Sequence, residues 1–325
     1  MIKKLKYLLC LLPLILLLYG CQSSKPPSWA SQPRQEDNGH LYGVGYGINQ
    51  KVAQKQAISH LSSQLWTQVE STSQFRNISN EINGTHHSQS LSDTAIFTKT
   101  ANLTFNGVQL TQSAMVNDVY YVEASIAKAQ LITELKQELD TLYDDIQTSI
   151  VSLSHTDPLL WWLNNADTSA YKHEILVKVS VLSALTQGTP EQKYIRAYRE
   201  LDELVAKTKS SINIQVATTS HEPWLKQFIT AYLAQAGLKN TDKATKASHT
   251  VEVDTNWRNK KLSSNYISTV LVQLKLKNKN NHTLKSNEII ASANSMSGYD
   301  LSKEGAARHF SEQLKTQGLW PSIGL

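Results

Sequence analysis

Four residues in the first half of the chain form a pattern that serine nucleophiles use. Ser125-Ile126-Ala127-Lys128 has the S-x-x-K spacing. Enzymes that use this pair also need a Ser-Asp-Asn and a Lys-Thr-Gly sequence, and neither occurs in the chain. The sequence also lacks G-x-S-x-G, H-E-x-x-H and a carboxylate-rich calcium loop. A four-residue match with two free positions is expected by chance, so we predict that the protein is not an enzyme.

A glycine-rich stretch, Gly43-Val44-Gly45-Tyr46-Gly47, could in principle hold a phosphate. The dinucleotide fingerprint G-x-G-x-x-G lets the backbone approach a pyrophosphate at the start of a helix. Here the third glycine comes one residue early, and Ile48 occupies the position that the fingerprint needs. We therefore expect structural glycines, on a strand that another backbone or side-chain layer approaches closely.

The residue types that bind metals are present but are not grouped. Of the ten histidines only His86 and His87 are adjacent, and adjacent residues on a strand point to opposite faces. No cysteine or carboxylate stands near them at ligand spacing. We expect no metal site and no cofactor.

The N-terminus has the composition of a secretory leader. Lys3, Lys4 and Lys6 precede a mostly apolar run over residues 7–19, which is followed by a polar segment. A helix that spans a bilayer needs about 20 apolar residues, so this run is too short. One of the two cysteines, Cys10, lies within the leader and the other, Cys21, follows it. We predict a signal peptide over residues 1–20. Its removal takes Cys10 away and leaves Cys21 as the only cysteine of the remaining chain.

The end of the leader, Leu18-Tyr19-Gly20-Cys21, resembles the box that bacterial lipoproteins carry. The resemblance implies cleavage before Cys21 and attachment of fatty acids, such as palmitate, to its thiol and its new amino group. Gln22 is not the aspartate that favours retention in the inner membrane in such lipoproteins. The resemblance therefore implies a lipid-anchored protein of the outer membrane that faces the periplasm. The alternative is an ordinary signal peptide followed by a chance cysteine.

Composition restricts the class of partner. Without residues 1–20, which carry three lysines and no acid, the formal net charge falls from +5 to +2. No block of Lys and Arg remains, so we do not expect nucleic acid as a partner. The remaining 305 residues can form two modest domains.

Local patterns divide the chain into five parts of an α+β protein, with two small sheet-and-helix modules joined by helices. The parts are 1–20, the signal peptide; 21–38, the lipidated cysteine and a tether; 39–127, an α+β domain; 128–210, a helical segment; and 211–325, a second α+β domain.

The first α+β domain is predicted from alternating strand and helix signals. A strand over residues 41–47 is followed by a helix with apolar residues at helical spacing from Ala53 to Val69. Residues 71–78 are predicted as a further strand. The pattern then indicates two strands, 109–116 and 119–126, around the turn Asn117-Asp118.

The same region resembles the LPP20 family of lipoproteins. The resemblance rests on the order of Pro26-Pro27-Ser28-Trp29, residues 42–47, the alanine-rich helix, Asn106-Gly107-Val108 and Val119-Tyr120-Tyr121-Val122. It covers roughly residues 26–130. The family includes outer-membrane lipoproteins and flagellar assembly lipoproteins, which implies a similar address and role here.

The segment 128–210 is predicted to form three helices. The first carries an apolar stripe that runs from Leu131 to Ile150 in steps of three and four. The second is expected to end at Gly188, and Thr189 is expected to cap the third. Short loops favour antiparallel packing within the chain, whereas the alternative is that part of the stripe packs on a sister subunit or partner. Trp161-Trp162 at the break between helices is interpreted as core, with a partner-binding patch as the alternative.

The last domain is predicted to have the order β-α-β-β-β-α. Its elements are strands at 212–216, 251–253, 266–276 and 284–293, a helix over 223–235 that ends at Gly237, and a helix that Asp300 caps and that carries Leu301, Phe310 and Leu314. The pattern loosely resembles periplasmic α/β domains of curli-secretion, peptidoglycan-synthase-activator and Tol-system proteins, and no residue role follows from it.

Two functions fit these observations. The first is a non-enzymatic outer-membrane lipoprotein that acts as a structural or assembly component of the cell envelope, with flagellar structures as the leading analogy. The second is a periplasm-facing regulator that activates a peptidoglycan synthase or another envelope machine. In both, the lipid anchor holds the membrane and the partner is an envelope protein or a further copy of the chain.

Overall fold

The protein combines two β-sheets with long helices, which confirms the predicted α+β class. The computed structural model describes residues 25–34, 39–71, 73–83, 106–188, 191–218 and 223–325. The chain separates into two compact units, here called unit 1 (Met1–Asp145 with Ser169–Tyr198) and unit 2 (Ile146–Thr168 with Arg199–Leu325). Each unit is described by itself.

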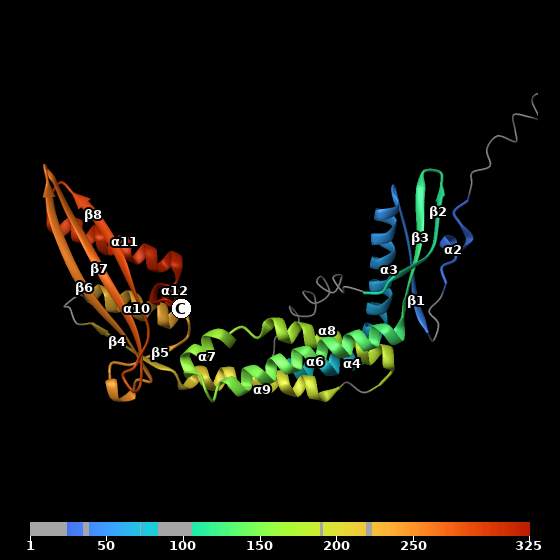
Figure 1. Cartoon of the computed structure of the whole chain (residues 1–325), viewed down its shortest axis with the longest axis horizontal. Coiled ribbons are helices and arrows are strands. Elements are labelled where there is room, and N and C mark those ends of the chain that lie inside the picture. The colour runs from blue at the N-terminus through green and yellow to red at the C-terminus, as the bar shows by residue number, and fades with distance from the viewer. Residues whose placement is uncertain (1–24, 35–38, 72, 84–105, 189–190, 219–222) are drawn as a thin grey trace, which may run out of the picture. The chain divides into compact units, whose positions relative to one another are not determined.

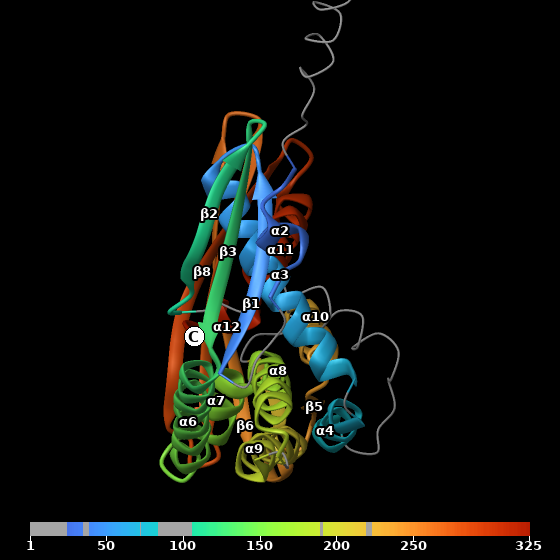
Figure 2. The same cartoon turned by 90° about the vertical axis from the view of Figure 1, so that its right-hand side faces the viewer.

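Unit 1 contains a three-stranded antiparallel sheet. Its strands are β1 (His40–Gly47), β2 (Gln109–Val116) and β3 (Val119–Ala127), in the order β1-β3-β2. Figure 2 shows the three strands beside one another. The predicted turn joins β2 to β3, with Asn117 and Asp118 at φ angles of 51° and 59°. Two consecutive positive φ angles are typical of the tight turns that match the twist of a hairpin, and Asn and Asp tolerate them.

Helix α3 (Gln50–Ser71) packs against β1 at very short range (Figure 1). A Cβ atom added at Gly45 would lie 2.2 Å from the carbonyl oxygen of Ala53, and one at Gly43 would lie 2.3 Å from that of Ala57. Only glycine leaves room for the helix at these two positions. The glycine-rich stretch therefore serves packing, as the structural interpretation predicted.

One strand prediction is wrong. Residues 71–78 were expected to be extended, but helix α4 (Ser73–Asn83) occupies most of this range. Ile78, Ser79 and Ile82 are buried while Asn77 and Asn80 are exposed, which is a helical pattern that packs on α8 (Ser169–Thr186). The following polar segment lies largely outside the described residues.

The segment between the sheets is helical, as predicted. Its helices are α6 (Lys128–Ser152), α7 (Pro158–Asn165), α8 (Ser169–Thr186) and α9 (Gln192–Ser211). In unit 1, Lys178 of α8 pairs with Glu138 of α6 at 3.2 Å, and Lys193 of α9 pairs with Asp140 of α6 at 2.7 Å. These contacts favour helix packing within the chain over packing on another subunit.

The end of α8 differs from the prediction. The left-handed residue after α8 is Gln187, at a φ angle of 50°, and not Gly188. Thr189 lies outside the described residues.

Trp161 and Trp162 are 1% and 6% exposed, and the Trp161 Nε1 donates a hydrogen bond to the Ser149 carbonyl at 2.7 Å. Their interpretation as core residues is confirmed.

Unit 2 contains a five-stranded mixed sheet with the order β5-β4-β6-β7-β8. The strands are β4 (Asn213–Thr218), β5 (Lys239–Asn240), β6 (His249–Leu262), β7 (Asn265–Asn278) and β8 (Thr283–Ser295). β4 pairs with β5 and β6 in parallel, and β6, β7 and β8 form an antiparallel meander. The predicted order of elements is confirmed, and the two-residue β5, a short 3-10 helix over Ala244–Lys246 and a terminal helix are additions.

Helices α10 (Pro223–Gln235) and α11 (Tyr299–Gln317) lie on one face of this sheet, followed by α12 (Leu319–Ile323) (Figure 1). The alternating residues Val270, Val272, Leu274 and Leu276 of β7 are fully buried beneath them. One prediction for the last helix is wrong. Gly298 is its N-cap while Asp300 lies in its first turn. Leu301 lies on this helix and is 53% exposed.

Candidate functional site

The predicted lipid attachment residue, Cys21, lies outside the described residues. The nearest described segment, residues 25–34, includes the short helix α2 (Ser28–Ser31), which packs on β3. Part of the predicted tether therefore lies against unit 1. The sequence did not reveal this contact, because proline-rich polar segments also occur as free linkers.

Arg34 holds this segment on the sheet. Its guanidinium lies 3.3 Å from the Oε2 atom of Glu123 in β3, and 5.3 Å from the centre of the Tyr42 ring in β1. The Glu123 side chain has no exposed surface. A buried carboxylate is stable only when it is paired and hydrogen-bonded, so the contact between Arg34 and Glu123 fixes where the N-terminal segment enters unit 1.

The two oxygens of Glu123 have different surroundings. Oε2 accepts hydrogen bonds from the Thr111 hydroxyl at 2.6 Å and from the Gln112 amide at 3.2 Å, in addition to the ion pair. Oε1 is buried and accepts no hydrogen bond from any described residue. An unpaired buried oxygen of this kind costs about 1–3 kcal/mol. Because Glu123 is fully enclosed, no substrate can reach it in this arrangement, and we assign it a structural role.

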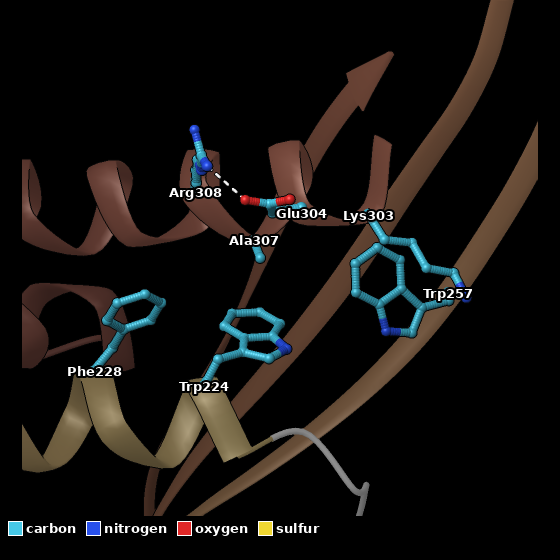
Figure 3. Close-up of a pocket in the computed structure, with 7 residues that line it drawn as sticks. All are labelled: Trp224, Phe228, Trp257, Lys303, Glu304, Ala307 and Arg308. Atoms are coloured by element: carbon cyan, nitrogen blue, oxygen red, sulfur yellow. Dashed lines mark hydrogen bonds and ion pairs between the residues drawn. The ribbon is translucent and has the colours of Figure 1, made fainter. Parts of the chain in front are cut away.

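An open groove lies in unit 2 between α10, α11 and the end of β6 (Figure 3). Trp224 and Phe228 from α10 and Trp257 from β6 contribute aromatic rings to it, and its volume is about 440 Å³. The Trp224 ring lies edge to face with both Phe228 and Phe310, at centroid distances of 6.0 and 5.9 Å. These edge-to-face contacts hold the Trp224 ring in position in the groove.

Helix α11 supplies the charged rim of the groove. Lys303 places its ammonium group 5.8 Å from the Trp257 ring, and Glu304 pairs with Arg308 along the helix. Among the described residues that line the groove, none is a His, Cys, Ser, Thr or Tyr. The groove can hold flat or apolar groups beside a cation.

A charged cluster in unit 1 has shifted pKa values. The ammonium group of Lys193 and the Tyr194 hydroxyl both donate to Asp140 Oδ1, at 2.7 and 2.9 Å. These hydrogen bonds, that from Lys193 first, hold the pKa of Asp140 below its usual value. Burial, with the hydrogen bond to Asp140, raises the pKa of Tyr194 to about 12. The cluster joins α9 to α6.

A second polar cluster lies inside unit 2. Asp157 caps α7 and its Oδ1 lies 2.8 Å from His249 Nε2, while the other ring nitrogen lies 2.9 Å from the Ser248 hydroxyl. Burial acts to raise the pKa of Asp157, but the hydrogen bonds from His249 and from two backbone amides outweigh it and lower the pKa. His249 is 3% exposed, and its contact with Asp157 connects β6 to the start of α7.

Two further sequence expectations concern metals and the membrane. No group of three or more His, Cys, Asp or Glu side chains capable of holding a metal is found within the described ranges. In the same part of the chain, no helix combines the length and the apolar composition that crossing a bilayer requires.

The contact between the N-terminal segment and the sheet coincides with a family match. Residues 27–127 match the LPP20 lipoprotein family. The resemblance seen in the sequence is thereby confirmed, and the LPP20 region includes α2 and the three strands of unit 1. No curated protein matches the chain at a significant level.

Several solved structures resemble parts of the chain at low sequence identity. A minor lipoprotein from Acinetobacter baumannii is 11% identical over 32% of this chain and 88% of its own, with a TM-score of 0.27. Lipoprotein GNA1162 from Neisseria meningitidis is 12% identical over 33% of this chain and 96% of its own, with a TM-score of 0.24. The secreted protein HP1454 from Helicobacter pylori is 12% identical over 86% of this chain and 98% of its own, with a TM-score of 0.39. At these scores the likenesses say nothing about what this chain binds.

Sequence reasoning missed the aromatic groove. Its lining comes from Trp224, Trp257 and Lys303, which are far apart in the sequence and meet only when α10 and α11 cover the same sheet face. Two tryptophans near the edges of predicted elements were the only available signal.

Proposed function

We propose that this protein is a non-enzymatic outer-membrane lipoprotein that serves as a structural or assembly component of the cell envelope, with flagellar structures as the leading case. The match of residues 27–127 to the LPP20 lipoprotein family carries the proposal. Cys21 bears the acyl chains, and the chain faces the periplasm.

The N-terminal contact supports this arrangement. Residues 25–34 begin four positions after Cys21 and are held on β3 through Arg34 and Glu123. A globular unit thus starts very close to the bilayer, without a long free linker. Two or three acyl chains at ~0.8 kcal/mol per buried CH₂ give an anchor that does not dissociate on its own.

The anchor is tested by labelling cells with radioactive palmitate and by mass spectrometry of the purified protein. The wild-type protein should incorporate label and begin with a modified Cys21. Cys21→Ser should lose the label, whereas the matched variant Cys10→Ser, altered within the leader, should keep it. An unmodified thiol at Cys21 or an uncut leader in the native protein would refute the anchor.

The address is tested by density-gradient separation of the two membranes. The wild-type protein should travel with the outer membrane, and Gln22→Asp should shift it to the inner membrane. The assembly role predicts that mild cross-linking of native envelopes captures a larger complex. A protein found only in the inner membrane and only as a monomer would contradict the proposal.

A second candidate function is activation of a peptidoglycan synthase or another envelope machine, and the aromatic groove favours it. Residues 211–325, which contain the groove, carry fourteen Lys and Arg against eight Asp and Glu. This module would therefore suit an acidic protein surface. Trp257→Ala should weaken binding to the purified synthase, whereas Ile290→Ala, at an exposed position of the same sheet, should not. Equal binding by both variants would exclude the groove as the contact.

A further inference from the structure

Two turns of unit 2 lie side by side at one end of its sheet. One joins β6 to β7 at Ser263 and Ser264, and the other joins β8 to α11 at residues 296–298. The pairing of Tyr266 with Ser295 brings the two turns together. The Tyr266 and Tyr299 rings also meet edge to face at 5.0 Å. In Figure 1 these turns are at the end of the sheet marked by the tip of β6 and the arrowhead of β8.

Three large apolar side chains are exposed on and beside these turns. Leu262 is 59% exposed, Met296 is 77% exposed and Leu301 is 53% exposed. Single exposed apolar residues are ordinary on protein surfaces, but several gathered at one place indicate an interaction site. We call Leu262, Met296 and Leu301 the apolar tip. None of them lines the aromatic groove.

Four cations lie on the strand and the helix that carry Leu262 and Leu301. Residues 256–266 and 295–303 contain Arg258, Lys260, Lys261 and Lys303, and a single carboxylate, Asp300. None of the four cations forms an ion pair with any residue in the described ranges. The ammonium group of Lys261 lies over the Tyr266 ring, 4.7 Å from its centre, in a cation–π contact.

The opposite end of the same sheet provides a comparison. There the turn between β7 and β8 contains Lys279 and His282, with Lys285 close by. No large apolar side chain is exposed among residues 279–285, and Leu284 is half-buried. The turn between β7 and β8 thus carries charge without an exposed large apolar side chain among residues 279–285.

We propose that the apolar tip docks on the surface of a bilayer that contains anionic phospholipid. Leu262, Met296 and Leu301 enter the boundary between headgroups and acyl chains, and the four cations contact the lipid phosphates. Exposed apolar side chains on and beside two adjacent turns, with Lys and Arg on the same elements and tyrosine rings close by, are the combination that membrane interfaces favour. A folded protein partner would instead need a surface shaped to receive the two turns. The contact goes beyond the proposed function, because it requires no lipid on Cys21.

The experiment uses the mature chain with Cys21→Ser, which lacks acyl chains, and measures co-sedimentation with vesicles. Vesicles of phosphatidylethanolamine and phosphatidylglycerol should bind the protein, vesicles of phosphatidylcholine alone should bind it much more weakly, and added NaCl should reduce binding. Each Lys near an anionic surface contributes ~1 kcal/mol, so Lys260→Gln with Lys261→Gln should weaken binding roughly 25-fold.

Matched control variants separate docking through the apolar tip from nonspecific electrostatic attraction and nonspecific hydrophobic adsorption to the vesicles. Lys279→Gln with Lys285→Gln removes the same charge from the opposite end and should leave binding within about twofold of the unmodified chain. Replacing the three residues of the apolar tip by serine should abolish most binding, whereas Ile290→Ser, at a side chain that is 60% exposed elsewhere on the sheet, should not.

A labelled variant keeps the test independent of how the triple variant folds. The Cys21→Ser mature chain contains no cysteine, so Leu262→Cys and Ile290→Cys can each carry one polarity-sensitive dye. The dye at position 262 should shift to the blue with anionic vesicles, and the dye at position 290 should not. Equal binding to neutral and anionic vesicles, equal losses in the tip and control variants, or no shift at position 262 would each overturn the proposal.

Discussion

Replacing Gly45 by alanine should destabilise unit 1 strongly. The new Cβ would lie 2.2 Å from the Ala53 carbonyl oxygen and 2.2 Å from the Ala57 backbone nitrogen. Comfortable contacts are roughly 3.5 Å, so α3 would have to move away from β1 by more than ~1 Å. Both obstructing atoms belong to the backbone, and no side-chain rotation can relieve the overlap. Overpacking usually costs about 1–3 kcal/mol, and we expect about 3 kcal/mol or more here.

Differential scanning calorimetry of the mature Cys21→Ser chain measures this effect. For a unit of this size, about 3 kcal/mol corresponds to a fall in Tm of roughly 6–12 °C. Gly305→Ala, whose Cβ would lie 2.7 Å from the Ala293 Cβ, should lower the transition of unit 2 instead and so identifies which transition belongs to which unit. Gly188→Ala, with no atom nearer than 3.2 Å, is the neutral control. A Gly45→Ala protein that melts like the wild-type protein would show that α3 does not pack on β1 at this distance.

Three further changes test polar contacts. Arg34→Gln should weaken docking of the N-terminal segment by about 1–2 kcal/mol, a modest amount because solvent screens the half-exposed arginine. Chymotryptic cleavage after Trp29 should become faster, and an unchanged rate would contradict the contact. Folding lowers the pKa of Asp157 below its ordinary value of 3.8. The ionised carboxylate therefore stabilises the folded state above pH 3.8, and this stabilisation is lost as the pH falls through the lowered pKa. The gap in unfolding free energy between wild-type and Asp157→Asn proteins, measured in urea, should therefore shrink below about pH 4, and a gap that does not vary with pH would argue against it. Tyr194→Phe should lower the free energy of unfolding by about 1 kcal/mol, because it removes the hydrogen bond to Asp140. Burial and that hydrogen bond raise the pKa of Tyr194 to about 12, so an ultraviolet titration of the variant should lack the phenol that titrates near pH 12.

The strongest sequence patterns predicted the fold of unit 2 well. Strict alternation from Tyr266 to Leu276 identified β7, because one sheet face is buried and every second residue must be apolar. The helix Pro223–Gln235 was predicted with its observed bounds, since proline starts it and Gly237, at a φ angle of 67°, follows its end. In these places local chemistry and tertiary burial agree.

The failures arise where a local pattern is compatible with more than one structure. Ile78 and Ile82 share a face in either a strand or a helix, and only their packing on α8 decides for α4. Leu301 lies on the last helix as predicted, but the apolar pattern does not show that it is exposed beside the turn before α11. The predicted site residue, Cys21, lies outside the described residues, so the structure does not test it. The groove and the apolar tip depend on which elements meet in space, and no residue spacing in the sequence contains that information.

The division of the chain between the two units has a practical consequence. The path passes from unit 1 to unit 2 after Asp145, returns after Thr168, and leaves again after Tyr198. No single cut can therefore release either unit intact. A fragment that stops before residue 211 would keep Trp161 and Trp162 but lose much of the unit to which they belong. Gene fusions and domain exchanges made with this protein would need to carry both units together, and so would any natural recombination that moved it into a new setting.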